Sequence, residues 1–252
     1  MTQSGGRKPD SLAADNRAIS AEGAGGQLIA SDPTLDNFCL QLHSTPDGQG
    51  VVVQYTGIPG NQPESYHNSV ALWDSWSPVI DGPNKTPPLV VVPISGNLQP
   101  STVFVPWPFT GTDYLITYQV GDSLTTMCAA LELSLKLKAT VPPTAISLSV
   151  SQLDATSITI VYNTLGGYLP KTYGNWVGVW QGFSGPYFAP TPDSWAPAGS
   201  DHTQDVLTVS NLRIIAGFDY RIIYFMGPQA DGVPGSNIGA VLTFKATEAL
   251  AP

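Results

Sequence analysis

The sequence predicts an all-β protein that contains two similar β-sandwich units in tandem, preceded by an extended N-terminal arm. Short apolar segments with a period of two recur along the chain, with Gly and Pro between them. No window of about eleven residues shows the period of an amphipathic helix. In addition, a block in the first half of the chain returns in the second half at a nearly constant spacing, which indicates an internal repeat.

The strand signals start after the arm. The segment MCAALELSLKLK (127–138) alternates Leu with charged or polar residues, which is typical of a strand with one buried and one solvent-facing side. The run ATVPPT (139–144) ends this pattern, because two prolines cannot lie in a central strand, and we interpret it as a linker. The other strand-like segments are FCLQL (38–42), VVVQY (51–55), YLITY (114–118), AISLSV (145–150), ITIVY (158–162), WVGVW (176–180), DVLTV (205–209), YRIIYFM (220–226) and AVLTF (240–244).

The repeat is visible when residues 51–73 are aligned with residues 158–180 at an offset of 107. The identical pairs are Tyr55/Tyr162, Gly60/Gly167, Pro63/Pro170, Tyr66/Tyr173, Asn68/Asn175, Val70/Val177 and Trp73/Trp180. A second block at an offset of 106 adds Asp113/Asp219, Tyr114/Tyr220, Ile116/Ile222, Tyr118/Tyr224 and Gly121/Gly227. A unit of roughly 105 residues with about seven short strands suits an immunoglobulin-like or fibronectin-like sandwich.

This repeat sets the predicted boundaries. We expect an arm at 1–33, a first sandwich at 34–138, the linker at 139–144 and a second sandwich at 145–248. The arm is rich in Gly, Ala, Ser and Asp and cannot form a core, so an ordered arm would have to dock on its own domains or on a neighbouring subunit.

The residues that the two copies share are interpreted as scaffold rather than as a site. Trp73 and Trp180 lie in strands that are apolar on both sides, and we expect each indole to fill the space between two sheets. Asn68 and Asn175 precede these strands, where an amide can close a turn onto backbone groups.

The second copy also resembles the SKICH domain, an immunoglobulin-like family. The residues that carry the likeness are Y…P…YGNWVGVW…FDYRIIYFMG…VPGSNIGAVLTF, over about residues 158–244 and more weakly over 51–133. The family has a DWIGIF-type central strand, whereas Asn175 stands here for the acidic residue and Ala71 for Gly in the first copy. The resemblance implies an immunoglobulin-like sandwich with a role in targeting and protein contacts rather than in catalysis.

Composition bounds the function classes. The chain has a net charge of -9 and a pI near 4.5, so phosphate backbones repel it and we expect no nucleic-acid partner. The chain has no run of about 18 apolar residues, so we expect no membrane span. The first residues lack the apolar core of a signal peptide, which predicts a protein that is cytoplasmic or released without a classical leader. Cys39 and Cys128 lie outside zinc-binding patterns, and spacing leaves open whether they pair.

No catalytic motif stands out, so we expect no catalytic residue, no metal site and no cofactor. His43 and His67 stand alone, with His67 in a loop. Asp201, His202 and Asp205 could hold a metal weakly, but a solvated acidic loop is the commoner explanation for such a cluster.

What remains are aromatic residues in loops. The candidate ligand-binding residues are Trp76, Trp107, Phe183, Tyr187 and Trp195. Such residues stack on sugar rings or anchor protein partners, or they cap the ends of the sandwiches and fill the seam between them. We therefore expect a non-catalytic recognition protein that binds a glycan or a protein surface. One alternative is a self-assembling structural protein, such as a coat or inclusion component, in which the N-terminal arm clamps neighbouring subunits of a homo-oligomer. A second, less favoured alternative is an enzyme with an unrecognised site.

Overall fold

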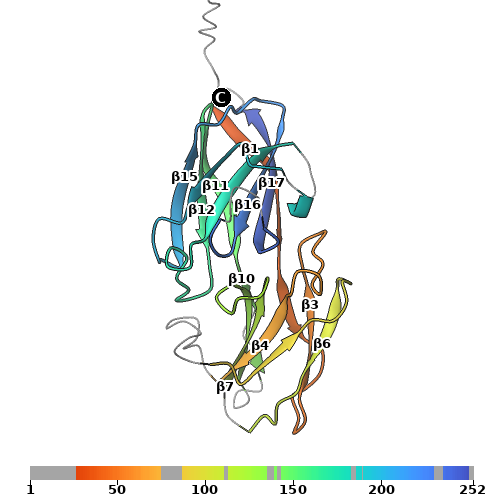
Figure 1. The fold of residues 1–252 in the computed structure, drawn as a ribbon. Helices are drawn as coiled ribbons and strands as arrows, with labels where there is room; N and C mark the ends of the chain where they lie inside the picture. The colour runs from red at the N-terminus through yellow and green to blue at the C-terminus, as the bar shows by residue number, and fades with distance from the viewer. Residues whose placement is uncertain are drawn as a thin grey trace, which may run out of the picture.

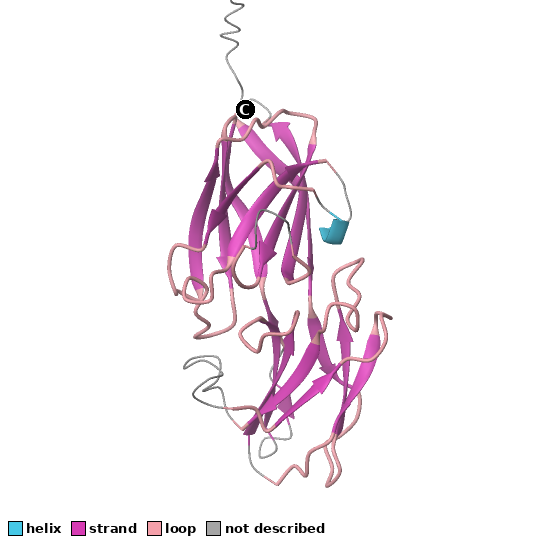
Figure 2. Cartoon of the chain, viewed as in Figure 1, coloured by secondary structure: helices cyan, strands magenta, loops and turns pink. Residues whose placement is uncertain are grey.

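The computed structural model describes residues 27–74, 87–110, 113–134, 139–140, 143–182, 186–188, 190–229 and 235–249. These residues form antiparallel β-strands and one short 3-10 helix, η1 (Pro186–Phe188), which confirms the predicted all-β fold (Figures 1 and 2). The described part of the chain holds no helix with the length and hydrophobicity that a transmembrane span requires.

The lower half of the molecule in Figure 1, here called unit 1, consists of two facing sheets. One sheet has the order β2-β3-β6, and the other has the order β10-β8-β7-β4-β5. The strands are β2 (Cys39–Leu42), β3 (Val51–Thr56), β4 (Ser69–Trp73), β5 (Val90–Pro93), β6 (Ser101–Val105), β7 (Asp113–Gln119), β8 (Met127–Ser134) and β10 (Thr144–Ala145).

The upper half, unit 2, repeats this strand order. Its strands follow one another as β14-β13-β16-β17 and β11-β12-β15, which matches β5-β4-β7-β8 and β2-β3-β6 of unit 1. The strands are β11 (Ser147–Asp154), β12 (Ser157–Asn163), β13 (Trp176–Gln181), β14 (Ser194–Pro197), β15 (Gln204–Ser210), β16 (Asp219–Phe225) and β17 (Ile238–Glu248).

An eighth strand joins the two halves of this second sheet. Strand β1 (Leu28–Asn37) pairs antiparallel with β17 at eight positions and with β11 through Leu28 and Leu153. The predicted boundary between arm and first sandwich, after residue 33, therefore falls inside a strand of unit 2. Sequence spacing carries no signal for this pairing, because the partners lie more than 200 positions apart.

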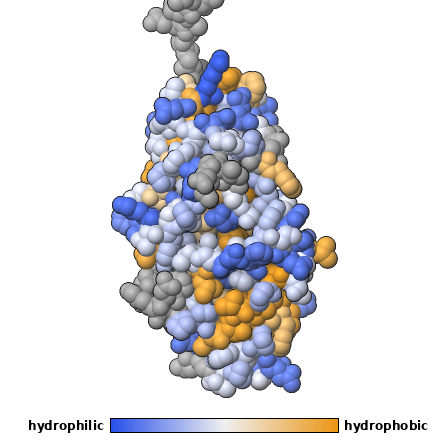
Figure 3. Space-filling view, viewed as in Figure 1, coloured by the Kyte–Doolittle hydropathy of each residue, from blue (hydrophilic) through white to orange (hydrophobic). Residues whose placement is uncertain are grey.

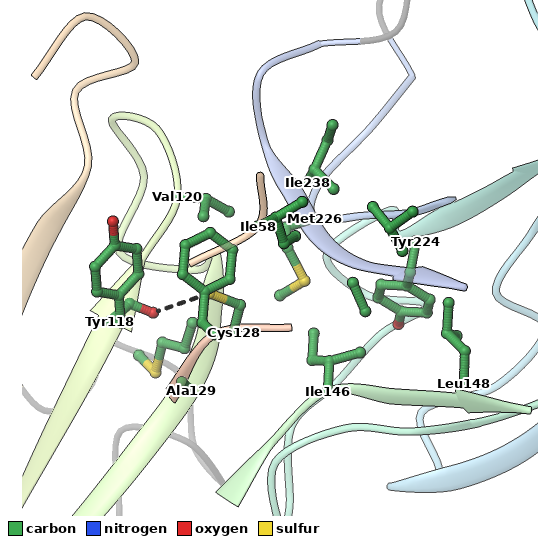
Figure 4. Close-up of a cluster of buried hydrophobic side chains, with 14 of the residues drawn as sticks. Ile58, Tyr118, Val120, Cys128, Ala129, Ile146, Leu148, Tyr224, Met226 and Ile238 are labelled. Atoms are coloured by element: carbon green, nitrogen blue, oxygen red, sulfur yellow. Dashed lines mark hydrogen bonds between the residues drawn. The ribbon is translucent and has the colours of Figure 1, made fainter. Parts of the chain in front are cut away.

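The chain crosses between the units twice. It passes from β1 to β2 through Phe38 and returns from β10 to β11. The segment 139–144, predicted as a linker, contributes β9 (Ala139–Thr140) and the start of β10, and both pair with β8. At the return crossing, Ile146 N donates to the Cys128 carbonyl oxygen (3.1 Å). Buried side chains of both units meet there, so that the core continues across the seam (Figure 4).

Tyrosine rather than tryptophan fills the space between the sheets. The rings of Tyr55 and Tyr118 lie 5.5 Å apart on facing strands, and those of Tyr162 and Tyr224 have the same separation in unit 2. Val70 and Val177 pair in register with Tyr118 and Tyr224, so the valine side of each strand faces the opposite sheet. The prediction that the tryptophans lie between the sheets was wrong, because side chains alternate along a strand. Trp73 and Trp180 project from the outer side and are nevertheless buried.

Candidate functional site

The aromatic residues predicted to bind a ligand do not form one site. Trp76 and Phe183 lie outside the described residues. Trp107, two residues after β6, is half-buried and packs against the core. Tyr187 of η1 lies at the seam. Trp195 of β14 is 48% exposed, and of the three described candidates it presents the largest aromatic surface.

Trp195 lies at the edge of an aromatic cluster on the outer face of unit 2. Its ring packs edge-on against Trp176, with centroids 6.3 Å apart and an angle of 80°. Trp176 in turn stacks flat on Phe225 at 4.1 Å, and Trp180 approaches the same Phe225 at 6.2 Å. Trp176, Trp180 and Phe225 are buried, so they form a fixed support for the exposed ring of Trp195.

Gly178 makes room for this cluster. It lies opposite Trp195 in the ladder between β13 and β14, and a Cβ at this position would stand 2.5 Å from Cη2 of Trp180. The Trp180 indole N–H donates to the Pro190 carbonyl oxygen (2.7 Å). In unit 1 the matching residue is Ala71, and there the Trp73 indole donates to Thr117 Oγ1 (2.7 Å). The two equivalent tryptophans therefore make different contacts.

Polar contacts hold the edge strand β14 in place. The Ser194 hydroxyl donates to the Ser210 carbonyl oxygen (2.6 Å), and Asp193 N donates to the Val179 carbonyl oxygen (2.9 Å). Asp193 Oδ2 accepts a hydrogen bond from Gln181 N (2.7 Å). Asp193 is exposed and lies directly before β14, two residues before Trp195.

Tyr187 belongs to the seam rather than to this surface. Its ring stacks on Tyr66 of unit 1 at 5.0 Å and 19°. Burial raises the pKa of Tyr187 well above its ordinary value. The alternative interpretation of the loop aromatics, that some of them fill the space between the units, therefore describes Tyr187.

A buried hydrogen-bond network explains why unit 1 keeps Asn68. Asn68 Nδ2 donates to the Tyr118 hydroxyl (3.0 Å) and to Asn61 Oδ1 (3.0 Å), while its Oδ1 accepts from Gly121 N (3.0 Å). Burial raises the pKa of Tyr118, so its hydroxyl stays protonated at neutral pH. One amide thus joins the turn before β4 to the turn after β7.

Unit 2 repeats the network with one exchange. Asn175 Nδ2 donates to the Tyr224 hydroxyl (3.1 Å), and its Oδ1 accepts from Gly227 N (2.8 Å). Tyr168 stands where unit 1 has Asn61, and its hydroxyl lies 3.3 Å from Asn175 Nδ2. That hydroxyl also donates to the Thr125 carbonyl oxygen of unit 1 (2.6 Å). The exchanged residue therefore links the unit 2 network to the neighbouring unit.

The titratable loop residues serve local structure. Asp201 accepts hydrogen bonds from both N and Oγ1 of Thr172 (2.8 Å each), and Asp205 Oδ2 accepts one from the Ser200 hydroxyl. Hydrogen bonds from Ser200 and from the Val206 backbone lower the pKa of Asp205. The described ranges contain no cluster of three His, Cys, Asp or Glu residues that could hold a metal.

His67 pairs with an acidic residue at the surface, and the two cysteines do not form a disulfide. His67 Nδ1 lies 2.9 Å from Asp122 Oδ1 at the surface. Its backbone is left-handed with a φ of 55°, where unit 2 has Gly174. Cys39 and Cys128 are free thiols, and burial raises the pKa of Cys128.

Two hollows lie near the seam. One of about 610 Å³ is lined by turn residues of unit 1, among them Asn61, Asn97 and Gln99. Another of about 470 Å³ lies between the units, beside Thr126 and Asn237. Trp195 lines neither of these two hollows, and its half-exposed ring is open to solvent.

Figure 3 shows a second apolar area over β4 and β6 of unit 1, on an otherwise largely polar face. Val91 of β5 is 38% exposed and Phe104 of β6 is 50% exposed. Among the described strands, β5 pairs only with β4 and β6 pairs only with β3. Within the described part of unit 1, β5 and β6 are thus edge strands that carry exposed apolar side chains.

A scan against protein-family models and a search of curated proteins both returned no match. The resemblance to the SKICH domain therefore stays a prediction. Sequence reasoning missed the support of Trp195 by Trp176 and Phe225. A signal was present, because Trp176 and Trp180 are four residues apart in a strand and share one side of it.

Proposed function

We propose that this chain is a non-catalytic recognition protein of two tandem immunoglobulin-like sandwiches that binds neutral carbohydrate on the Trp195 surface. The observation that supports it is a half-exposed indole, mounted on a strand and held edge-on by the buried Trp176. A side chain that is already ordered loses little conformational freedom when a ligand binds.

The chemistry of this surface suits a sugar ring. An indole offers a flat apolar face with negative charge density, on which the C–H side of a pyranose can pack. Asp193 lies directly before β14, and its carboxylate, with one oxygen held by Gln181 N, has further lone pairs for ligand hydroxyls. The net charge of -9 disfavours acidic glycans, and this is why we propose a neutral ligand.

A glycan array probed with the full chain tests this proposal. We expect wild-type protein to retain neutral oligosaccharides and Trp195→Val to lose them, by at least about 10-fold in affinity as for other aromatic binding anchors. Val is the natural control residue, because Val91 occupies the matching place on β5 of unit 1.

Val91→Ala serves as the matched control and should bind like wild type. Thermal unfolding of each variant shows whether it is folded. Absence of neutral-glycan binding, or equal binding by folded Trp195→Val, would contradict the proposal. Capture of a protein partner in a Trp195-dependent manner would instead support the targeting role that the SKICH resemblance implies.

A further inference from the structure

Strand β1 is an addition to a unit that is already complete without it. Unit 2 contains the same seven strands as unit 1, in the same order, and β1 lies between its β17 and β11. In unit 1 the described strands on the corresponding edge of β8 are the two-residue strands β9 and β10. The long β17 edge is thus covered by a separate segment that comes from the N-terminal side of unit 1.

Side-chain burial holds β1 only weakly. None of its ten residues is fully buried, and Ile29 and Leu35 are 42% and 36% exposed. The ladder to β17 is interrupted between Ser31 and Thr34, where Asp32 has a φ of 50°. A left-handed backbone at a residue other than Gly costs free energy, so this irregularity weakens the strand further. The ladder to β17 and the partly buried Leu28 and Ala30 attach β1 to unit 2.

Charge favours this strand on this edge. Two of the four basic residues in the described part of the chain, Arg221 and Lys245, lie on β16 and β17. The acidic residues Asp32 and Asp36 lie on β1, and Asp36 interacts electrostatically with Arg221. The contact between Asp36 and Arg221 favours this strand on this edge, where β17 itself carries one cation, Lys245, and one acid, Glu248.

The attachment points of β1 belong to different units. Its C-terminal end is joined through one residue, Phe38, to β2 of unit 1, where Phe38 stacks on Tyr118 at 4.7 Å. Its ladder partner β17 belongs to unit 2. Separation of the units would leave β1 joined to β2 through Phe38 and would open the β17 edge to an identical strand.

We propose that the β17 edge binds β1 of a second copy of this chain, so that two chains exchange this strand and form a dimer. The same eight residue pairs form in the monomer and in the exchanged dimer, so chain concentration and the contacts at the seam set the balance between them. Exchange of β1 would supply a specific interface for a self-assembling protein. It is independent of carbohydrate binding, although a dimer would present two Trp195 surfaces and gain avidity.

A mixed-chain disulfide test identifies the exchange. Ser31 and Lys245 lie opposite each other in the ladder and are partly exposed and exposed, respectively. One chain carries Ser31→Cys and the other, with a size tag, carries Lys245→Cys, both with Cys39→Ser. Directly opposite residues in an antiparallel pair are close enough for a disulfide. The chains are unfolded, refolded together at increasing concentration and oxidised.

We expect a covalent heterodimer on a non-reducing gel, with a yield that rises with concentration and exceeds the control at least about fivefold. The control pairs Ser31→Cys with Thr208→Cys, an exposed residue on β15. A chain carrying both Ser31→Cys and Lys245→Cys shows that the bond can form within one molecule.

Heterodimer at the control level in the mixed sample would overturn the proposal. Light scattering on refolded wild-type chain gives a second measurement that needs no substitution. A dimer mass at high concentration supports the exchange, and a monomer mass at every concentration overturns it. Neither readout involves carbohydrate, so these results stand apart from the glycan test.

Discussion

The two units of this molecule are most alike in their buried hydrogen-bond networks. They differ most at residues that face the other unit or the solvent. Both keep an asparagine that bonds a buried tyrosine and a glycine N–H, with donor–acceptor distances of 2.8 to 3.1 Å. They differ at Asn61 and Tyr168, where the tyrosine reaches the other unit, and at Val91 and Trp195, where the tryptophan faces solvent. Shared residues thus form the scaffold, whereas the residues that differ include a contact between the units and the exposed Trp195.

The largest effect is expected when the shared network is broken. Asn175→Ala leaves the Tyr224 hydroxyl and Gly227 N buried without their partner, and it should lower the free energy of unfolding by about 2–4 kcal/mol. Asn68→Ala should do the same in unit 1. Urea denaturation measures both. Asn163→Ala, which removes a part-buried hydrogen bond to Ser147, is the control and should lose less than about 1 kcal/mol. Comparable losses for Asn175 and Asn163 would show that the network is not the scaffold.

A smaller loss of stability is expected from a substitution at Gly178, the position at which the surroundings of Trp180 differ from those of Trp73. Gly178→Ala places a methyl group 2.5 Å from Trp180 and should destabilise the protein by about 1–3 kcal/mol. Near-ultraviolet circular dichroism should report the displaced aromatic cluster. Ala71→Gly in unit 1 removes a methyl group without such a clash and serves as the matched comparison. An unchanged spectrum for Gly178→Ala would show that the packing of Trp180 does not depend on a glycine at this position.

The contact between the units can be tested at Tyr168. Tyr168→Phe keeps the ring but removes the hydroxyl that donates to the Thr125 carbonyl oxygen, and it should lower the free energy of unfolding by about 1–2 kcal/mol. Hydrogen exchange at the amides around Thr125 should become faster. Tyr66→Phe, which keeps the stack on Tyr187, is a control that should leave this exchange unaltered. If both variants exchange like wild type, the hydroxyl does not fasten the units.

The smallest effect concerns pH. Hydrogen bonds from Ser200 and Val206 hold the pKa of Asp205 below 3.8, so its stabilising contribution is present above that pH and disappears as pH falls through the folded-state pKa. The difference in unfolding free energy between wild type and Asp205→Asn should therefore shrink below pH 3.8. Urea denaturation between pH 6 and pH 3 measures it, with Asp154→Asn as the acidic control. A difference that stays constant over this range would show that these hydrogen bonds do not stabilise the ionised Asp205 side chain.

The sequence predicts the strands well and their surroundings less well. Alternating residues indicate a strand, but a strand that is apolar on both sides does not reveal which side faces the second sheet, and this is why Trp73 and Trp180 were misplaced. The repeat identifies Asn68 and Asn175 as turn-closing residues, and in the structure both accept a hydrogen bond from a turn glycine.

Two features depend on contacts between distant parts of the chain. The pairing of β1 with β17 has no local pattern, because the added strand comes from outside the repeat. Exposure of the loop aromatics is likewise a tertiary property. From the sequence alone, Trp195 and Tyr187 are equally good candidates for ligand binding. In the folded chain Trp195 is exposed, whereas Tyr187 packs on Tyr66 at the seam.

The most direct measurement is a calorimetric titration of the best neutral oligosaccharide from the array into wild type, Trp195→Val and Val91→Ala. If residues that differ between the units carry function, wild type and Val91→Ala bind equally and Trp195→Val binds at least about 10-fold more weakly while unfolding at the same temperature. Equal binding by all three folded proteins would contradict the assignment of recognition to the Trp195 surface.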